Sequence, residues 1–393
     1  MRLSRLVKAA TLATTLAQSL APAVAQGAEQ PPIVVTAGPY QPQDKDERGL
    51  WMQMDEAERK LRTSNFVIRD AALNAYVRDV FCRTVGPRCG EVRIYIMRTP
   101  YFNANIAPNG MMQLWSGLLL RTRDEAQLAA VLAHEYSHYA DRHSLQLFRQ
   151  ARDKAASATF FAMFGLVGAL VALGQISAIM EFSRDQEAAA DAGSVTLLAK
   201  AGYDPMAASR IWEQFRAEAD ATAVARRMKS RKDRTGGLFA SHPPSADRVA
   251  ALSAQASALK TPHGMAIHRD AYRTALASFW PSLIDDQIKL NDFGATEYLI
   301  GHLADQGWTP ALSYARGELY RTRGTATDLT AAAGYYRKAC AEAGAPVESW
   351  RGLGLALLRS GDADGGREAL KTYLVRKPDA PDRAMIAMMA GVN

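Results

Sequence analysis

The chain has 393 residues, of which 48% are apolar and 22% charged, so it is long enough for one large or two moderate globular domains, and a disordered chain is excluded. The formal net charge of +7 falls to +4 without residues 1–25, because that segment carries three basic and no acidic residues (7 − 3). Such mild basicity, without a long run of Lys and Arg, argues against nucleic acid as a partner.

The first residues have the pattern of a secretory signal peptide. Three basic residues precede an apolar stretch that ends in the small-x-small sequence Ala23-Val24-Ala25. This pattern predicts export, with residues 1–25 removed by cleavage before Gln26. A membrane anchor is the alternative, which the shortness of the apolar run disfavours. Residues 26–48, rich in Pro and Gln, are expected to form an extended leader.

Export leads to an oxidising compartment, where disulfides persist. Cys82 and Cys89, with six residues between them, are close enough in the sequence to close a small loop, which would leave Cys340 as the odd thiol. The alternative is that all three cysteines are unpaired.

A small sheet is predicted in the first part of the folded region. Residues recur at helical spacing from Trp51 to Phe81, and Val92 to Met97 then alternate as in a strand. Two further strands, at residues 103–107 and 111–115, are joined by Pro108-Asn109-Gly110, a sequence typical of turns. The sheet therefore comes just before the next predicted helix.

That helix carries the strongest chemical motif of the chain. It is predicted to begin near Thr122 or Asp124 and contains the HExxH segment from His134 to His138. Residues four apart are separated by about 400° on a helix, so the two histidines project from one face and can chelate one Zn²⁺. Glu135 lies about 100° around from His134, where it can take a proton from an attacking water without binding the metal.

A second acidic helix supports the metal site, because HExxH alone also occurs on solvated helix faces. Glu187 and Asp191 share one helix face by the same four-residue spacing. Glu187 can be the third ligand, and Asp191 can accept a hydrogen bond from the distal nitrogen of a ligating histidine. A solvated acidic pair is the alternative, which the three alanines between the two residues disfavour. His143, nine residues beyond His134, is predicted to lie on a different helix face and is left out of the site.

Two further segments stand out by composition. Residues 158–174 are 17 consecutive uncharged, mostly apolar residues, and three interpretations are open: a buried helical hairpin, a lid that dips into the membrane surface, and a true membrane span. Residues 216–237 are polar and basic and predict a solvated, mobile loop, with contact to anionic lipid as the alternative.

The C-terminal third contains an internal repeat. Four pairs of residues are offset by 37: Gly317 and Gly354, Gly324 and Gly361, Ala332 and Ala369, and Tyr336 and Tyr373. The second copy resembles the tetratricopeptide helix-turn-helix pattern, whose period of about 34 residues requires three insertions here. Repeats of this kind form grooves for peptides or partner helices, although a plain helical packing domain is the alternative.

Four blocks of the sequence together resemble one known family. They are Asn103-Ala104 before the Gly110 turn, the HExxH segment, the ExxxD pair of Glu187 and Asp191, and Ser241-His242-Pro243-Pro244 leading to Arg248. With these blocks, residues 50–260 resemble the gluzincin peptidases that include the HtpX-type and CAAX-prenyl proteases. The resemblance is greatest to the periplasmic BepA-like proteases, which also carry C-terminal tetratricopeptide repeats.

The resemblance implies one zinc ion per chain, bound by His134, His138 and Glu187, with Glu135 as the base and Asp191 supporting a ligand. It also implies a periplasmic protease that takes part in quality control of envelope proteins, including outer-membrane protein assembly.

The resemblance also implies further site residues, in the block from Ser241 to Arg248 and in the block that begins at Asn103. His242 and Arg248 are expected at the zinc, where His242 either occupies the open position in a resting enzyme or stabilises the oxyanion. The alternative is that both residues only cap the helix that follows. The strand that contains Asn103, Ala104 and Asn105 is expected to bind substrate by β-addition, a sequence-tolerant mode that suits unfolded chains.

Together these features predict a mainly α (α+β) protein with a zincin-like catalytic domain at residues 49–262 and a tetratricopeptide-like helical domain at residues 263–393. The predicted function is an exported zinc endopeptidase that acts on misfolded or stalled envelope proteins; a chaperone or scaffold with a plugged metal site is the alternative. The expected partners are unfolded or misassembled substrates, outer-membrane assembly machinery bound through the repeats, and a peripheral membrane contact through residues 158–174.

Overall fold

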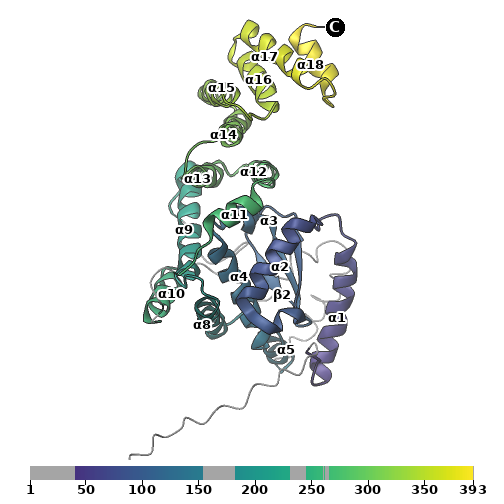
Figure 1. Ribbon diagram of the computed structural model, residues 1–393, viewed down its shortest axis with the longest axis vertical. Coiled ribbons are helices and arrows are strands. Elements are labelled where there is room, and N and C mark those ends of the chain that lie inside the picture. The colour runs from purple at the N-terminus through teal and green to yellow at the C-terminus, as the bar shows by residue number, and fades with distance from the viewer. Residues whose placement is uncertain (1–39, 154–181, 231–244, 260, 262–264, 393) are drawn as a thin grey trace, which may run out of the picture. The chain divides into compact units, whose positions relative to one another are not determined.

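The computed structural model describes residues 40–153, 182–230, 245–259, 261 and 265–392. Helices dominate, and a small three-stranded sheet lies among the first of them (Figure 1). The predicted fold class, mainly α with a small sheet, is therefore confirmed. The predicted signal peptide lies outside the described residues.

Two helices occupy the first stretch of predicted helical spacing. They are α1 (Lys45–Arg62) and α2 (Ala71–Val85). The spacing is confirmed within each helix but not across the break between them. There, Val67 forms an isolated bridge with Met97, and the side chain of Asp70 accepts a hydrogen bond from the third backbone N–H beyond it, which begins a new helix.

The sheet has the strand order β1-β3-β2, with β1 at Arg93–Met97, β2 at Ala104–Ile106 and β3 at Met111–Trp115. β1 runs parallel and β2 antiparallel to the central strand β3. β2 and β3 are the predicted strand pair, and their connecting turn uses Gly110, whose φ of +81° is unfavourable for other residues. Among the described residues, β2 is thus an edge strand, paired with β3 on one side only.

Helix α4 (Glu125–Ala140) is buried along almost its whole length. It begins after Asp124, one of the two predicted positions, whose side chain accepts a hydrogen bond from the backbone N–H of Gln127 at 2.9 Å. α4 packs against α2 and against α8 (Arg184–Lys200). A helix enclosed on all sides belongs to the protein interior, so its HExxH segment does not lie on a solvated surface helix.

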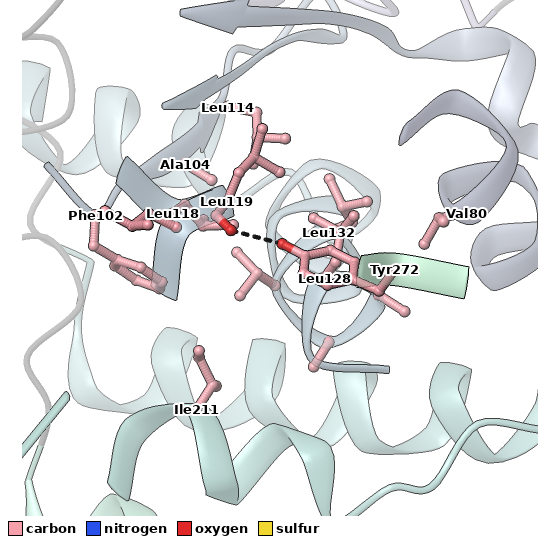
Figure 2. Close-up of a cluster of buried hydrophobic side chains, with 14 of the residues drawn as sticks. Val80, Phe102, Ala104, Leu114, Leu118, Leu119, Leu128, Leu132, Ile211 and Tyr272 are labelled. Carbon is pink, nitrogen blue, oxygen red and sulfur yellow. Dashed lines mark hydrogen bonds between the residues drawn. The ribbon is translucent and has the colours of Figure 1, made fainter. Parts of the chain in front are cut away.

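One hydrophobic core joins the sheet, α4 and later helices. Figure 2 shows part of this core: side chains from the strands, from α4 and from α9 (Ala207–Ala225), together with Tyr272. The Tyr272 hydroxyl donates a hydrogen bond to the carbonyl of Leu119 at 2.8 Å, which satisfies a polar group in this fully buried side chain.

The same core extends past residue 263, where the second domain is predicted to begin. It includes buried side chains of α11 (Arg269–Leu276), α12 (Trp280–Ile288), α13 (Phe293–Leu303) and α14 (Pro310–Arg323). The division into domains 49–262 and 263–393 stays a prediction.

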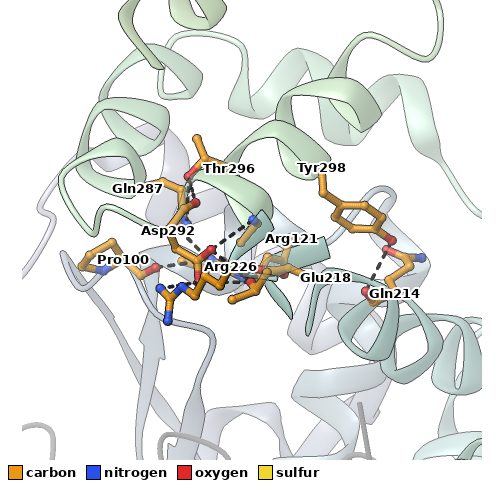
Figure 3. A network of polar contacts seen from close by, with 12 residues as sticks. Pro100, Arg121, Gln214, Glu218, Arg226, Gln287, Asp292, Thr296 and Tyr298 are labelled. Carbon is orange, nitrogen blue, oxygen red and sulfur yellow. Dashed lines mark hydrogen bonds and ion pairs between the residues drawn. The ribbon is translucent and has the colours of Figure 1, made fainter. Parts of the chain in front are cut away.

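A buried ion pair ties α9 to its neighbours (Figure 3). Arg121, at the end of α3 (Ser116–Arg121), pairs with Glu218 of α9 at 2.7 Å and donates to Gln287 of α12 at 3.0 Å. Burial raises the pKa of Glu218, although the Arg121 guanidinium opposes the rise. The prediction of a loop from residue 216 onward was therefore wrong as far as residue 225, because buried contacts of this kind hold the segment as part of α9.

The C-terminal repeat consists of helix pairs. α14 pairs with α15 (Ala326–Cys340), α16 (Glu348–Ser360) pairs with α17 (Ala363–Arg376), and α18 (Arg383–Ala390) follows. Gly324 and Gly361 end the first helix of each pair in the left-handed conformation, with φ of +72° and +95°. The internal repeat is confirmed as two similar helical units, and its tetratricopeptide character stays a prediction.

A disulfide joins Cys82 of α2 to Cys89 in the short 3-10 helix η1 (Gly86–Glu91), which decides between the two alternatives left open by the sequence. Cys340 is a free thiol. The bridge therefore ties the end of α2 to the segment that leads into β1.

Among the described residues, none of the helices has the length and apolar character needed to cross a membrane. The apolar segment 158–174 lies outside the described residues, so its three interpretations stay open.

Candidate metal centre

Three side chains from two helices converge at one point. His134 and His138 lie one turn apart on α4, with their Nε2 atoms 3.1 Å apart. Glu187, in the first turn of α8, has one carboxylate oxygen 3.6 Å from Nε2 of His134 and the other 3.4 Å from Nε2 of His138. All three residues are buried, and their potential ligand atoms lie within 4.8 Å of one another. The structure thus brings together the three predicted metal ligands.

The donor set fits zinc. Two imidazole nitrogens and one carboxylate oxygen form the ligand set of one class of catalytic zinc site, which keeps a further position open for water or substrate. Imidazole nitrogens also suit zinc better than the hard cations calcium and magnesium, which prefer oxygen donors.

Small residues allow α8 to approach α4 closely enough for Glu187 to reach the histidines. A Cβ atom added to Gly193 of α8 would lie only 2.9 Å from the Cβ of Ser137 on α4. The neighbouring Ser194 donates a hydrogen bond from its hydroxyl to the carbonyl of Ala130 at 2.8 Å. A capping box at the start of α8 fixes the turn that carries Glu187.

Asp191 supports the first ligand. Its Oδ1 atom lies 3.0 Å from Nδ1 of His134, so the opposite ring nitrogen, Nε2, is directed at the centre. Arg248 of α10 (Ala246–Ala258) donates to both oxygens of Asp191, at 2.7 and 2.8 Å. Burial alone would raise the pKa of Asp191, but Arg248 and His134 keep it below its usual value. Asp191 is therefore an ionised hydrogen-bond acceptor, in contact with the ligand as predicted.

Arg248 is a central cation of the site. Besides Asp191, its guanidinium contacts Glu187 at 3.2 Å and lies over the ring of Trp212 at 4.0 Å. Burial alone would lower the pKa of Arg248, but the neighbouring carboxylates raise it above its usual value. The alternative that Arg248 only caps its helix was wrong, because the side chain of Ser245 caps α10. A catalytic role for Arg248 stays a prediction.

Glu135 follows His134 on α4 and is buried. Its charge is one of those that raise the pKa of Arg248. Glu135 thus adjoins the ligand His134 in α4, and its role as the base stays a prediction.

His143 lies at the site, contrary to the prediction. α4 ends at Ala140, and Arg142 has a left-handed φ of +56°, so the chain turns before α5 (His143–Asp153) begins. As a result, Nδ1 of His143 lies 2.9 Å from Nδ1 of His138. Burial lowers the pKa of His143. The exclusion of His143 was wrong because helical spacing places residues only as long as the helix continues.

The predicted substrate strand is the edge strand β2, which contacts α4. Asn103 accepts a hydrogen bond from the N–H of Trp115 at 3.0 Å, and Asn105 is paired with Gln113. In an antiparallel pair the backbone groups of alternate residues face the partner strand, so those of Ala104 face away from β3. Of the three predicted residues, Ala104 is therefore the one whose peptide groups are oriented to pair with an added strand.

His242 lies outside the described residues. Its expected place at the open metal position stays a prediction.

An HExxH helix joined by a second helix that supplies a glutamate ligand and, four residues on, an aspartate is an arrangement found in zinc metallopeptidases. The sequence agrees with this class: residues 67–256 match the profile of peptidase family M48. Residues 67–256, just under half of the chain, are therefore similar to this family.

Several proteins are similar in sequence to this part of the chain. The beta-barrel assembly-enhancing protease of Escherichia coli K12 is 28% identical over 187 residues, which cover 42% of this chain and 38% of the relative. A relative in Vibrio cholerae, also named for beta-barrel assembly enhancement, is 28% identical over 228 residues, or 52% of this chain and 46% of the relative. The mitochondrial metalloendopeptidase OMA1 of Schizosaccharomyces pombe is 35% identical over 126 residues, or 31% and 37%. The chain thus spans less than half the length of each of these relatives.

Proposed function

We propose that this protein is a zinc-dependent endopeptidase of the periplasm that cleaves misfolded or stalled envelope proteins. The observation that carries the proposal is the convergence of His134, His138 and Glu187 within 4.8 Å, beside the buried Glu135. The names of the relatives, which include beta-barrel assembly-enhancing proteases, support a role in envelope protein assembly.

The residues of the site divide the chemical work. Zinc, when bound by His134, His138 and Glu187, supplies Lewis acidity, which lowers the pKa of water and polarises the substrate carbonyl. Glu135 accepts the proton of the attacking water and returns it to the leaving amine nitrogen. Asp191 holds His134 in the tautomer whose Nε2 carries the free lone pair.

We propose that unfolded chains bind at the edge strand β2. An extended substrate that pairs with β2 forms its hydrogen bonds through the backbone, so recognition depends little on sequence. Ala104 provides the N–H and C=O groups on this side of the sheet. Most extended segments of a folded protein are already paired within its own sheets, so this mode of binding favours unfolded substrates.

The test is proteolysis by the purified full-length chain. Casein, an unfolded substrate, is incubated with protein of measured zinc content, with chelator, and with chelator followed by zinc. We expect cleavage that chelator abolishes and zinc restores.

One outcome favours the alternative function. If the protein contains stoichiometric zinc but leaves casein intact, and His242→Ala is also inert, the chain is a chaperone or scaffold with a plugged metal site. Cleavage that persists in the absence of all metal contradicts both functions.

A further inference from the structure

The two histidine ligands have different supports on their distal nitrogens. Nδ1 of His134 faces the carboxylate of Asp191, which is held by Arg248. Nδ1 of His138 instead faces Nδ1 of His143 at 2.9 Å, with the two rings nearly perpendicular and their centres 4.9 Å apart. The second ligand is therefore supported by another imidazole.

The proton positions follow from the chemistry of a metal ligand. If Nε2 of His138 binds the metal, its lone pair is used there and the ring hydrogen resides on Nδ1. That Nδ1–H donates to the lone pair on Nδ1 of His143, whose own hydrogen is then on Nε2. A hydrogen bond between two Nδ1 atoms requires this pairing of one donor and one acceptor.

We infer that His143 is a positioning residue, which orients His138 for metal binding by accepting this hydrogen bond. The inference rests on the proposed zinc-dependent function. Phe182 contributes to the same orientation, because its ring stacks on that of His138 at 4.0 Å with an interplanar angle of 19°. His138 is thus held by stacking against its face and by a hydrogen bond at its edge.

The turn that brings His143 to His138 is itself held in place. The guanidinium of Arg142 lies over the ring of Tyr40, 3.3 Å from its centre, and over the ring of Tyr139 at 4.6 Å. It also lies 3.8 Å from the buried carboxylate of Glu47 in α1. These contacts stabilise a left-handed residue that is not glycine and would otherwise be unfavourable.

Three variants of the full-length protein test the inference. His143→Ala removes the acceptor. His143→Asn keeps an acceptor, since the amide oxygen can occupy the position of Nδ1. His302→Ala, which removes a partly buried histidine from α13, is the matched control.

The primary measurement is zinc affinity by competition with a chromophoric chelator, supported by the absorption spectrum of the cobalt-substituted protein. Loss of a residue that supports a ligand reduces metal affinity by about 10- to 100-fold. We expect a loss near the lower end of this range for His143→Ala, because a neutral imidazole is a weaker acceptor than a carboxylate. His143→Asn should bind zinc within about threefold of wild type, and His302→Ala should equal it.

Two results would overturn the inference. The first is wild-type zinc affinity in His143→Ala, and the second is an equal loss in His143→Asn and His143→Ala, which would assign the effect to packing. Urea unfolding of the metal-free variants shows whether each is folded. If His143→Ala is not folded, the zinc affinity of His143→Asn tests the inference instead. A wild-type protein that fails to bind zinc at all would instead refute the proposed function, and the inference with it.

Discussion

Gly193→Ala is expected to separate the two helices that carry the metal ligands. The new Cβ would lie 2.9 Å from the Cβ of Ser137 and closer still to its hydroxyl oxygen, whereas ordinary contact begins at 3.4 Å. Rotation of the Ser137 side chain can move its hydroxyl oxygen away but not its Cβ, so the helices must move apart by about 0.5 Å (3.4 − 2.9). Glu187 would then be displaced relative to the histidines by a distance equal to the largest displacement that a metal site tolerates.

The magnitude follows from comparison with a second glycine. Overpacking of this kind costs about 1–3 kcal/mol, while a change from Gly to Ala within a helix gains up to about 1 kcal/mol. Gly301→Ala in α13 is the matched control, because a Cβ there meets no atom within 4 Å. The free energy of unfolding of Gly193→Ala should therefore lie about 1–3 kcal/mol below that of Gly301→Ala.

The assay is urea unfolding of both variants, together with zinc affinity. The double variant Ser137→Gly with Gly193→Ala restores space between the helices and should recover zinc binding, with a coupling energy of about 0.5–3 kcal/mol. The reasoning is refuted if Gly193→Ala is as stable as Gly301→Ala and binds zinc as tightly as wild type.

The remaining predictions concern a buried carboxylate and the open metal position. Burial alone would raise the pKa of Glu58, but hydrogen bonds from Arg93 and Tyr95 lower it from 4.5 to about 2. The ionised carboxylate therefore stabilises the fold by up to about 3 kcal/mol above pH 4.5, and this advantage over Glu58→Gln should vanish as the pH falls through 2. An advantage that persists at pH 2 in urea unfolding would contradict the assignment, and Glu56→Gln, at an exposed ion pair, is the control. If His242 occupies the open metal position in all but a tenth of the wild-type molecules, His242→Ala is expected to speed casein cleavage about tenfold. An unchanged rate would mean that His242 has only a structural role.

Much of the metal centre could be predicted because it depends on local geometry. His134 and His138 are related by the helical period, and so are Glu187 and Asp191. Asp124 marks the start of α4 by its side-chain cap. Each of these features depends on residues within a few positions of one another, which is the range over which sequence patterns predict structure.

The features that were missed depend on where a helix stops and on tertiary contacts. His143 reaches His138 because α4 ends three residues earlier and Arg142 adopts a left-handed conformation. No glycine marks that turn, and it is stabilised by contacts with Tyr40, about 100 positions away in the sequence. Residues 216–225 contain five alanines, which favour a helix, and Glu218 is buried there against Arg121; the basic residues that suggested a loop begin at Arg226, just after α9 ends.

The most direct test of the account compares wild type with Glu135→Gln at equal zinc content. Glu213→Gln, at an exposed position of α9, controls for the loss of one carboxylate. Peptide-bond cleavage of casein is followed by mass spectrometry. We predict that Glu135→Gln retains zinc but loses about 10²- to 10⁴-fold in rate, since the proton acceptor is gone, while Glu213→Gln cleaves normally. Undiminished cleavage by zinc-loaded Glu135→Gln would contradict the account.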